Sequence, residues 1–452
     1  MGKFIFITLV LISANRFCYS QDSLTYKLTL DIPIFEFPEN IDLPQKFPSM
    51  NQASKWSTDF YELGFWGIDE LGNKIFINKN NNPSKTKKVL NQIFKYSIGF
   101  AFSKYGSELP IPLGVWAHEE FHRATLGVSN IKSKNGNWIF HRWDGTVYGI
   151  SDLTLDNLKQ EDVNQLLYSY VAGVQYEIYL NQSISLNNFY YKRTHYKNSL
   201  LLYNAFYMYN YFKFSTSSLS DSVKVIAPKY EDGNPINRDY AGADLTSWVY
   251  DMFNPDLPFS SRDSFPNGDG INRRIGFSDL SSVEKDYLLK QKKISLINFL
   301  NPSIFFLNRI NLSANLSFNL FFQYVPTNFG NSISCIIPLT YKKYNVLLSY
   351  SRFDNNLVLG NGYGLGIYNY KIKSKIDVDI SANIWNQPKE FMTSSKKIGG
   401  AINTKIDYSL KKGMDLYLEL NYKSKGWLIG NPYLKSNIFL GAGLRLDLYL
   451  KK

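Results

Sequence analysis

The last third of this chain alternates apolar and polar residues with a period of two. The pattern is clearest in the runs 310–322, 376–384, 402–408, 416–422 and 440–450. Because successive side chains of a β-strand point to opposite faces, each run predicts a strand with one apolar and one polar face. Long strands with an all-apolar face are typical of transmembrane barrels, whose outer surface contacts lipid.

Weaker alternation near 332–344, 345–353 and 360–372 brings the expected number of strands to eight. Eight strands suit a small closed barrel, and an even number is usual for such barrels in bacteria. We therefore predict an eight-stranded antiparallel transmembrane β-barrel from residue 304 to residue 452. The alternative is a soluble β-sandwich, whose strands alternate in the same way.

The connections between these expected strands are alternately long and short. Residues 386–395 and 424–436 are long connections, whereas the short ones lie near Lys342–Asn345, Lys371–Ser374 and Lys411–Gly413. Outer-membrane barrels have short periplasmic turns and longer extracellular loops. The rhythm therefore predicts a barrel that starts and ends on the periplasmic side, with the part before it in the periplasm.

The polar face of the expected barrel carries charges of both signs. They are Asp377, Asp379, Asp407, Asp415, Glu419, Asp447, Lys375, Lys405 and Arg445. The interior of an eight-stranded barrel is only wide enough to hold side chains. We therefore expect these charges to pair across the interior, and the barrel to be a membrane anchor rather than a channel.

The chain begins with a pattern typical of a secretory signal peptide, which we assign to residues 1–20. Lys3 supplies a positive start, and Phe4–Ile12 form an apolar run that is too short to cross a bilayer as a helix. The chain has 452 residues, so two domains are expected, with residues 21–303 preceding the barrel. The net charge is +12, but the lysines are scattered, which argues against nucleic-acid binding.

Residues 21–303 are expected to be mainly helical, which makes the chain α+β. Apolar residues at intervals of three and four, together with helix-ending signals, predict helices near 84–106, 112–127, 160–180, 199–214, 243–253 and 281–300. The last of these begins with a capping box, Ser281-x-x-Glu284. Residues 21–80 look mixed, and Gly72-Asn73 is expected to form a turn between short strands.

His118-Glu119-Glu120-Phe121-His122 lies in the second of these helices and reads H-E-x-x-H. Residues i and i+4 share a helix face, so both imidazoles can bind one Zn²⁺ from the same side. Glu119 follows the first histidine, where its carboxylate can take a proton from a zinc-bound water. The alternative is a helix whose histidines only cap or pack, with Glu119 paired to Arg123.

A tetrahedral catalytic zinc needs a third protein ligand. No histidine occurs in residues 123–130, so an acidic residue on another helix is the remaining solution. We choose Glu177, which lies in an otherwise apolar helix where a carboxylate needs a partner. Ala172 and Gly173, about one turn before it, would let two helices approach closely. A solvent-facing Glu177 is the alternative, and the rival ligands are Glu161, Asp144 and His141.

The motif His118–His122 with the downstream Glu177 resembles the gluzincin branch of zinc metallopeptidases. The resemblance covers two helices, and Asn181 stands four residues after Glu177 where the family has Asp. It implies hydrolysis of peptide bonds, with the two histidines and Glu177 as zinc ligands and Glu119 as the general base.

Two other parts of the sequence carry residues that could contribute to such a zinc site. His195 follows the Glu177 helix and could stabilise an oxyanion, or it could be a surface histidine. The segment Asp239–Asp244 opens a helix, and its acids could orient a ligand histidine, although helix capping explains them equally well.

These predictions describe an outer-membrane zinc metallopeptidase with its catalytic domain in the periplasm. The expected cofactor is Zn²⁺, and the expected partners are a peptide or protein substrate and outer-membrane lipid, with no nucleic acid. The first alternative is a barrel-anchored binding or assembly protein whose metal site is structural or vestigial. The second is a barrel that functions through its extracellular loops, with the helical part as a plug or scaffold.

Overall fold

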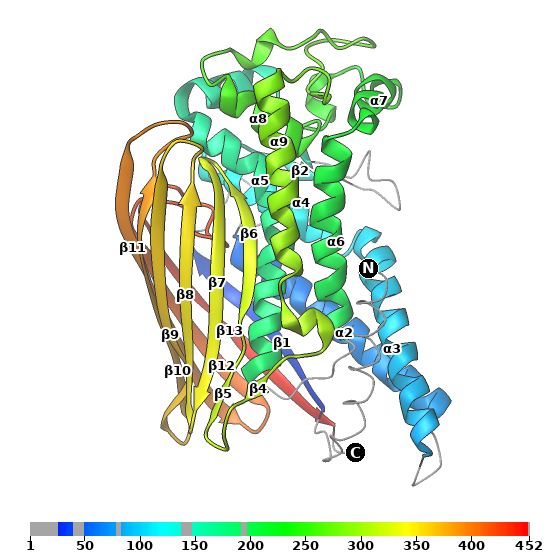
Figure 1. The fold of residues 1–452 in the computed structure, drawn as a ribbon, viewed down its shortest axis with the longest axis vertical. Coiled ribbons are helices and arrows are strands. Elements are labelled where there is room, and N and C mark those ends of the chain that lie inside the picture. The colour runs from blue at the N-terminus through cyan, green and yellow to red at the C-terminus, as the bar shows by residue number, and fades with distance from the viewer. Residues whose placement is uncertain (1–25, 39–48, 78–82, 137–146, 191–196, 451–452) are drawn as a thin grey trace.

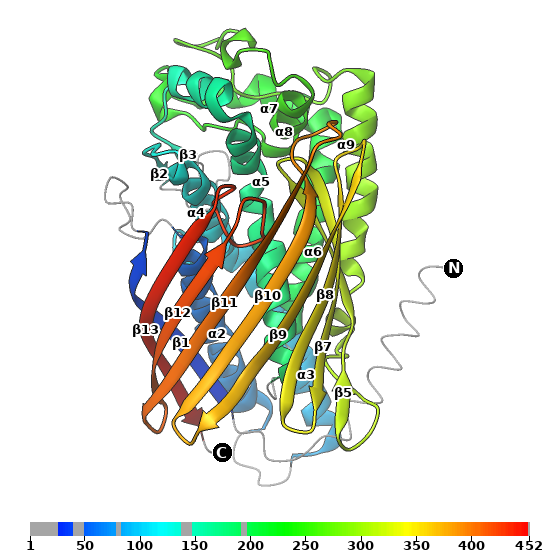
Figure 2. The same ribbon diagram turned by 90° about the vertical axis from the view of Figure 1, so that its left-hand side faces the viewer.

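The computed structural model describes residues 26–38, 49–77, 83–136, 147–190 and 197–450. Figure 1 shows two layers, a curved antiparallel sheet and a set of helices that covers one of its faces. Figure 2 shows the other face of the sheet, which no helix covers. The signal peptide assigned to residues 1–20 lies outside the described residues.

One sheet of 11 strands has the order β1-β13-β12-β11-β10-β9-β8-β7-β5-β4, with β6 paired to β7. A separate small pair is formed by β2 and β3. The strands are β1 (Tyr26–Phe37), β2 (Lys134–Asn135), β3 (Val147–Tyr148), β4 (Ile310–Asn311), β5 (Leu316–Phe318), β6 (Phe321–Thr327), β7 (Gly330–Tyr341), β8 (Tyr344–Asp354), β9 (Leu359–Lys373), β10 (Ile376–Pro388), β11 (Lys396–Lys411), β12 (Met414–Lys423) and β13 (Asn437–Leu450).

The sheet differs from the predicted eight-stranded closed barrel in strand number and in closure. It has 11 strands, and no pairing of the described residues joins its end strands β1 and β4. The run 310–322 is divided into β4, β5 and β6, first by a turn at residues 312–315 and then at buried Asn319, whose side-chain amide donates to the carbonyls of Leu307 and Asn308. The N-terminal strand β1 pairs with β13, so the sheet is not confined to residues 304–452.

The predicted alternation of long and short connections is confirmed from β7 to β13, but β6 and β7, for which a long connection was also predicted, are joined by residues 328–329 alone. The short turns are residues 342–343, 374–375 and 412–413, and the longer connections are residues 355–358, 389–395 and 424–436. The two kinds lie at opposite ends of the sheet (Figure 1).

The uncovered face of the sheet is apolar. Its exposed apolar side chains include Leu348, Tyr363, Leu365, Ile367, Ile380, Ile384, Ile398, Ile402, Ile406, Leu416, Leu418, Leu420 and Ile438. The face toward the helices carries the charges, but they pair between nearby strands of the sheet and not across a closed interior: Arg445 of β13 lies 3.3 Å from Asp407 of β11, and Lys405 of β11 lies 3.9 Å from Glu419 of β12. Lys55 from a helix also pairs with Glu419, at 2.7 Å. The sheet thus has one face suited to lipid and one suited to a polar interior.

All six helices predicted from periodicity are present in the structure. The longest, α5, has 39 residues and contains one non-helical residue, Asp162. The predicted capping box begins α9. The helices are α2 (Met50–Phe76), α3 (Lys85–Tyr105), α4 (Gly114–Val128), α5 (Asp152–Tyr190), α6 (Asn198–Ser215), α7 (Ser218–Ile226), α8 (Asp244–Phe253) and α9 (Ser282–Ser295). No helix among the described residues is long and apolar enough to cross a membrane.

Helix α2 occupies a segment for which the sequence predicted extended chain and a turn at Gly72-Asn73. Gly72 lies inside the helix, where a Cβ atom would lie 2.5 Å from Oδ1 of Asn91 and 2.9 Å from Cε of Lys95 in α3. Glycine is therefore required here for close approach of two helices. The prediction was wrong because a glycine that permits packing and a glycine that makes a turn look alike in one sequence.

Helices α2, α3, α6 and most of α5 lie beside the strands, and α7 and α8 lie beyond the end with the longer connections (Figures 1 and 2). Several helices contact the longer connections. The hydroxyl of Tyr168 in α5 donates to the carbonyl of Asn431 at 2.7 Å, and Lys290 of α9 lies 3.8 Å from Asp354 at the end of β8. The structure therefore does not have the predicted helical part suspended below the short-turn end of a barrel.

Candidate metal centre

Helix α4 carries the H-E-x-x-H residues and packs against α5. The side chains of Ala117, Phe121 and Ala124 are buried and hold this helix in the core. His118 and His122 are 3% and 1% exposed, and their ring centroids lie 4.9 Å apart. The prediction that the two imidazoles share one helix face is confirmed.

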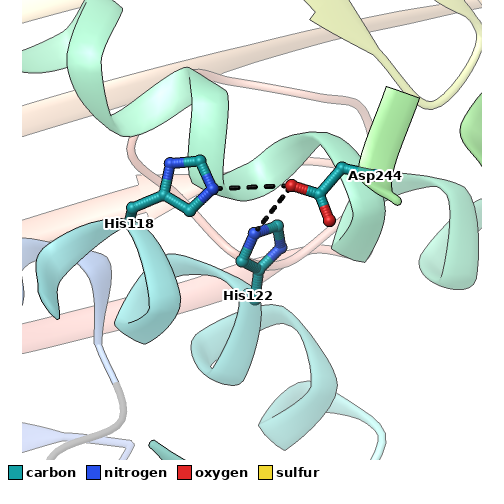
Figure 3. A group of neighbouring side chains, drawn as sticks. All are labelled: His118, His122 and Asp244. Atoms are coloured by element: carbon teal, nitrogen blue, oxygen red, sulfur yellow. Dashed lines mark ion pairs between the residues drawn. The ribbon is translucent and has the colours of Figure 1, made fainter. Parts of the chain in front are cut away.

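Asp244, the first residue of α8, meets both histidines. Its Oδ2 lies 3.5 Å from Nε2 of His118 and 3.4 Å from Nε2 of His122 (Figure 3). Two ligands of a tetrahedral zinc with bonds of about 2.0–2.1 Å lie about 3.3 Å apart. The two nitrogens and the carboxylate oxygen therefore fit a zinc ion bound between them, with a fourth position left for water.

The space beside the two imidazoles exists because residue 173 of α5 is a glycine. A Cβ atom at Gly173 would lie 2.3 Å from Nε2 of His118 and 2.3 Å from Nε2 of His122. The predicted close approach of two helices at this residue is confirmed. Gly173 also leaves room at the two nitrogen atoms that face Asp244.

Glu177, the predicted third ligand, contacts the other side of one imidazole. Its Oε1 lies 3.1 Å from Nδ1 of His118, whereas Nε2 of the same ring faces Asp244. A metal-binding histidine usually donates its second ring N–H to a carboxylate or a carbonyl, which fixes the orientation of the ring. The geometry gives Glu177 this orienting role and gives Asp244 the place of the third ligand.

His122 is oriented in a similar way. Its Nδ1 lies 2.5 Å from the carbonyl oxygen of Ser169 and 3.1 Å from the hydroxyl of Tyr240. The ring of Tyr240 stacks on Tyr170 at 5.9 Å, and the Tyr170 hydroxyl donates to buried Asp251 at 2.9 Å. Both histidines therefore have Nδ1 held by the protein and Nε2 directed at the same space.

Glu119 lies next to this space and has no hydrogen-bond or ion-pair partner among the described residues. Its side chain is partly exposed, unlike that of Glu120. Arg123 donates to Glu120 at 2.7 Å, so the alternative pairing of Arg123 with Glu119 is not found. Without a metal ion, desolvation raises the pKa of Glu119 to about 8, although the charges of His118 and His122 act to lower it. A zinc ion beside it would favour the carboxylate form, which is the form that accepts a proton.

Asp244 is held in its charged form. Burial alone would raise the pKa of its carboxyl, but without a metal ion the charge of protonated His122 and hydrogen bonds with both imidazoles bring the pKa well below its usual value. A zinc ion between neutral imidazoles would supply the same positive charge. The hydroxyl of Tyr211 lies 3.3 Å from the backbone nitrogen of Asp244, at the start of α8. A carboxylate fixed in this form is suited to binding a cation.

The other candidates from the sequence do not reach the three ligand atoms. Glu161 is exposed on α5, and Asp239 accepts a hydrogen bond from the backbone nitrogen of Gly242 at 2.6 Å. His141, Asp144 and His195 lie outside the described residues.

The sequence indicated Asp239–Asp244 only as acids that orient a histidine or cap a helix. The contact of Asp244 with both imidazoles was missed, and so was Tyr240, for which no local pattern gave a signal.

No family model matches the sequence, and no curated protein matches it. Among solved structures, a NanC porin aligns over 31% of this chain and 76% of its own, with 11% identity and a TM-score of 0.25. OccK5 (OpdH) of Pseudomonas aeruginosa aligns over 31% of this chain and 48% of its own, with 8% identity and a TM-score of 0.24. At these TM-scores neither similarity carries an argument, and the gluzincin resemblance rests on the motif residues alone.

Proposed function

We propose that this protein is a membrane-anchored zinc metallopeptidase that hydrolyses peptide bonds. His118, His122 and Asp244 bind the zinc ion, and Glu119 is the general base. One observation carries the proposal: the Nε2 atoms of both histidines and Oδ2 of Asp244 converge on the space left by Gly173.

A metal ion accounts for this geometry better than a set of ion pairs does. Without a metal, both Nε2 atoms would need protons to meet Asp244, while both Nδ1 atoms already face acceptors. Both rings would then be imidazolium cations, with centroids 4.9 Å apart in the core. Like charges this close in a buried site destabilise each other. Neutral imidazoles with Nε2 free are the form that binds a metal.

The residues around the site have distinct tasks in peptide hydrolysis. A bound zinc ion supplies a Lewis acid that polarises the scissile carbonyl and lowers the pKa of a water molecule. Glu119 takes the proton of the attacking water on its carboxylate and passes it to the leaving amine. Glu177 and the carbonyl of Ser169 keep the two imidazoles in their orientation throughout.

The apolar uncovered face of the sheet supports anchoring in an outer membrane, with lipid against that face. In such membranes short turns are periplasmic and longer connections extracellular. The metal centre lies at the end with the longer connections, because Tyr168 bonds to Asn431 and the adjacent Ser169 bonds to His122. We therefore place the site on the outer side of the membrane, in place of the periplasmic position predicted from the sequence.

The test is the variant Glu119→Gln in the full-length protein purified in detergent. Zinc content and hydrolysis of a mixed peptide pool are measured on the same samples. Glutamine keeps the shape of glutamate but cannot accept the proton, so zinc should be retained while the rate falls about 10²–10⁴-fold. Glu161→Gln, at an exposed position of α5, is the matched control and should change neither quantity.

Two results would overturn the proposal. Stoichiometric zinc without hydrolysis of any peptide by the wild-type protein would favour the alternative of a binding or assembly protein with a structural or vestigial metal. A wild-type protein that binds no zinc would remove the metal centre altogether.

A further inference from the structure

The fully buried residues of helix α3 are polar or small, and several of its large apolar residues are exposed. Its buried positions are Asn91, Lys95, Gly99 and Ser103, which recur every four residues. Its exposed positions include Leu90, Ile93 and Ile98, which are 46%, 57% and 38% exposed. A surface helix of a protein in water has the opposite distribution, with apolar residues on the covered face.

Helix α2, which packs against α3, also presents apolar residues to the surroundings. Phe60, Leu63, Leu71 and Ile75 are between 38% and 55% exposed. The same helix buries Asp69, whose Oδ1 lies 2.5 Å from Nζ of Lys95. An ion pair thus lies between the two helices while large apolar side chains face outward.

This inverted arrangement is the one expected in lipid. Ionisable side chains at membrane depth face the protein interior and pair with each other. Lys95 is 3% exposed and donates to Asp69 and also to Oδ1 of Asn73, at 2.7 Å. Outward leucine and isoleucine residues meet no penalty against acyl chains, whereas in water each would expose apolar surface.

The charges at the two ends of α3 fit the same environment. Lys85 and Lys87 are exposed at its start and Lys104 and Tyr105 at its end, and no exposed residue between Lys87 and Lys104 is charged. Lysine and tyrosine are favoured at membrane–water interfaces. The helix has 21 residues, which corresponds to a length of about 31 Å, close to the hydrocarbon thickness of about 30 Å.

We propose that the outward faces of α2 and α3 contact the acyl chains of membrane lipids. The two helices then form part of the membrane-embedded wall on the side where β1 and β4 do not pair. Helix α3 lies at the level of the strands, on the far side of the helices from the sheet (Figure 1). Contact along one face needs no helix that is apolar all round. The inference rests on the proposed membrane anchoring of the sheet.

The test uses nitroxide spin labels on single cysteines in the full-length protein, reconstituted in phosphatidylcholine bilayers. Cys18→Ser with Cys335→Ser provides the cysteine-free background, and Leu63→Cys and Ile93→Cys are the test positions. Leu418→Cys, on the uncovered face of the sheet, is the lipid reference, and Tyr230→Cys, at 76% exposure, is the aqueous reference. Collision rates with oxygen, which concentrates in lipid, and with a water-soluble nickel chelate are measured at each site.

The ratio of oxygen to nickel collisions at Leu63 and Ile93 should match that at Leu418 and exceed that at Tyr230 several-fold. A ratio like that of Tyr230 would overturn the inference and show that these faces are in water. Low collision rates with both reagents would also overturn it, because a second copy or another protein would then cover the helices. If Leu418 itself behaved like Tyr230, the membrane anchoring would fail. An unfolding temperature in detergent equal to that of the unlabelled protein shows that each labelled variant is folded.

Discussion

Two carboxylates touch His118, at opposite nitrogen atoms of its ring. Oδ2 of Asp244 lies 3.5 Å from Nε2, and Oε1 of Glu177 lies 3.1 Å from Nδ1. In the proposed centre the first carboxylate is a ligand of the ion, and the second only orients a ligand. Removal of the two carboxylates should therefore have unequal consequences for metal affinity.

We expect Asp244→Ala to lose stoichiometric zinc, because only two protein ligands remain. Glu177→Gln should keep zinc at saturating concentration but bind it about 10–100-fold more weakly, which is the usual cost of losing a partner that orients a ligand. Competition with a chromophoric chelator measures both affinities. If Glu177→Gln lost zinc and Asp244→Ala retained it, Glu177 would be the ligand after all.

His118, Glu119 and His122 could be identified from the sequence because their spacing on one helix is a local property. Asp244 could not be chosen in the same way, because it reaches the histidines only through the packing of α8 against α5. Glu177 was singled out as a buried carboxylate that needs a partner, and it has one in His118. A sequence pattern does not distinguish a carboxylate that binds a metal from one that orients a ligand.

At the scale of elements, the contact of α4 with α5 makes the site. Helix α4 contributes the two histidines, and α5 contributes Ser169, Gly173 and Glu177, which lie at intervals of four residues on one of its faces. The site therefore depends on a short distance between the two helices, which Gly173 permits.

We expect Gly173→Ala to abolish zinc binding, because the added methyl group would occupy the space beside both Nε2 atoms. Overpacking of this kind also costs about 1–3 kcal/mol of stability, which thermal unfolding would measure. Gly67→Ala in α2 is the matched control, since a Cβ there meets nothing within 4 Å. The control should keep zinc and gain up to about 1 kcal/mol from helix propensity. Normal zinc binding by Gly173→Ala would contradict the assigned position of the metal.

Long elements with a sustained period were predicted well, and irregular elements were not. The seven strands from β7 to β13 follow the alternation of the sequence, and α3, α6 and α8 follow its helical period. The prediction of one continuous strand over residues 310–322 was wrong. One reason is that the side chain of buried Asn319 donates hydrogen bonds to the preceding loop, at Leu307 and Asn308. Helix α2 was not predicted because four of its large apolar residues are exposed and because Gly72, which permits helix packing, looks like a turn residue in the sequence.

At the scale of the whole molecule, the orientation of the sheet in the membrane decides on which side the proposed metal centre lies. The proposal puts the longer connections, and the metal centre with them, on the outer side. In a background with Cys18→Ser and Cys335→Ser, we expect Ser394→Cys, in a longer connection, to react with an impermeant maleimide on intact cells. Tyr230→Cys should react under the same conditions, because it lies in the helical part of the chain at 76% exposure. Lys412→Cys, in a short turn, should react only after the outer membrane is permeabilised. Labelling of Lys412→Cys alone on intact cells would reverse the orientation.

The open sheet was not predictable from the period of its strands. Alternation determines which side chains share a face, but it does not show whether the last strand meets the first. Here β1, separated from the other ten strands by the helices, joins β13 and leaves β4 at the other end. The helices then lie in the gap between the two end strands, β1 and β4, which further strands would fill in a closed barrel.

Asp244 begins α8, whereas both histidines belong to α4, and each of these helices packs against α5. A bound ion would thus be a removable cross-link between segments that are far apart in the chain. The free energy of metal binding would then be part of the free energy of folding. Loss of the zinc ion would then remove a structural cross-link between α4 and α8 as well as the Lewis acid of the proposed reaction. The supply of zinc outside the cell would set how long the protein survives there, in addition to how fast it works.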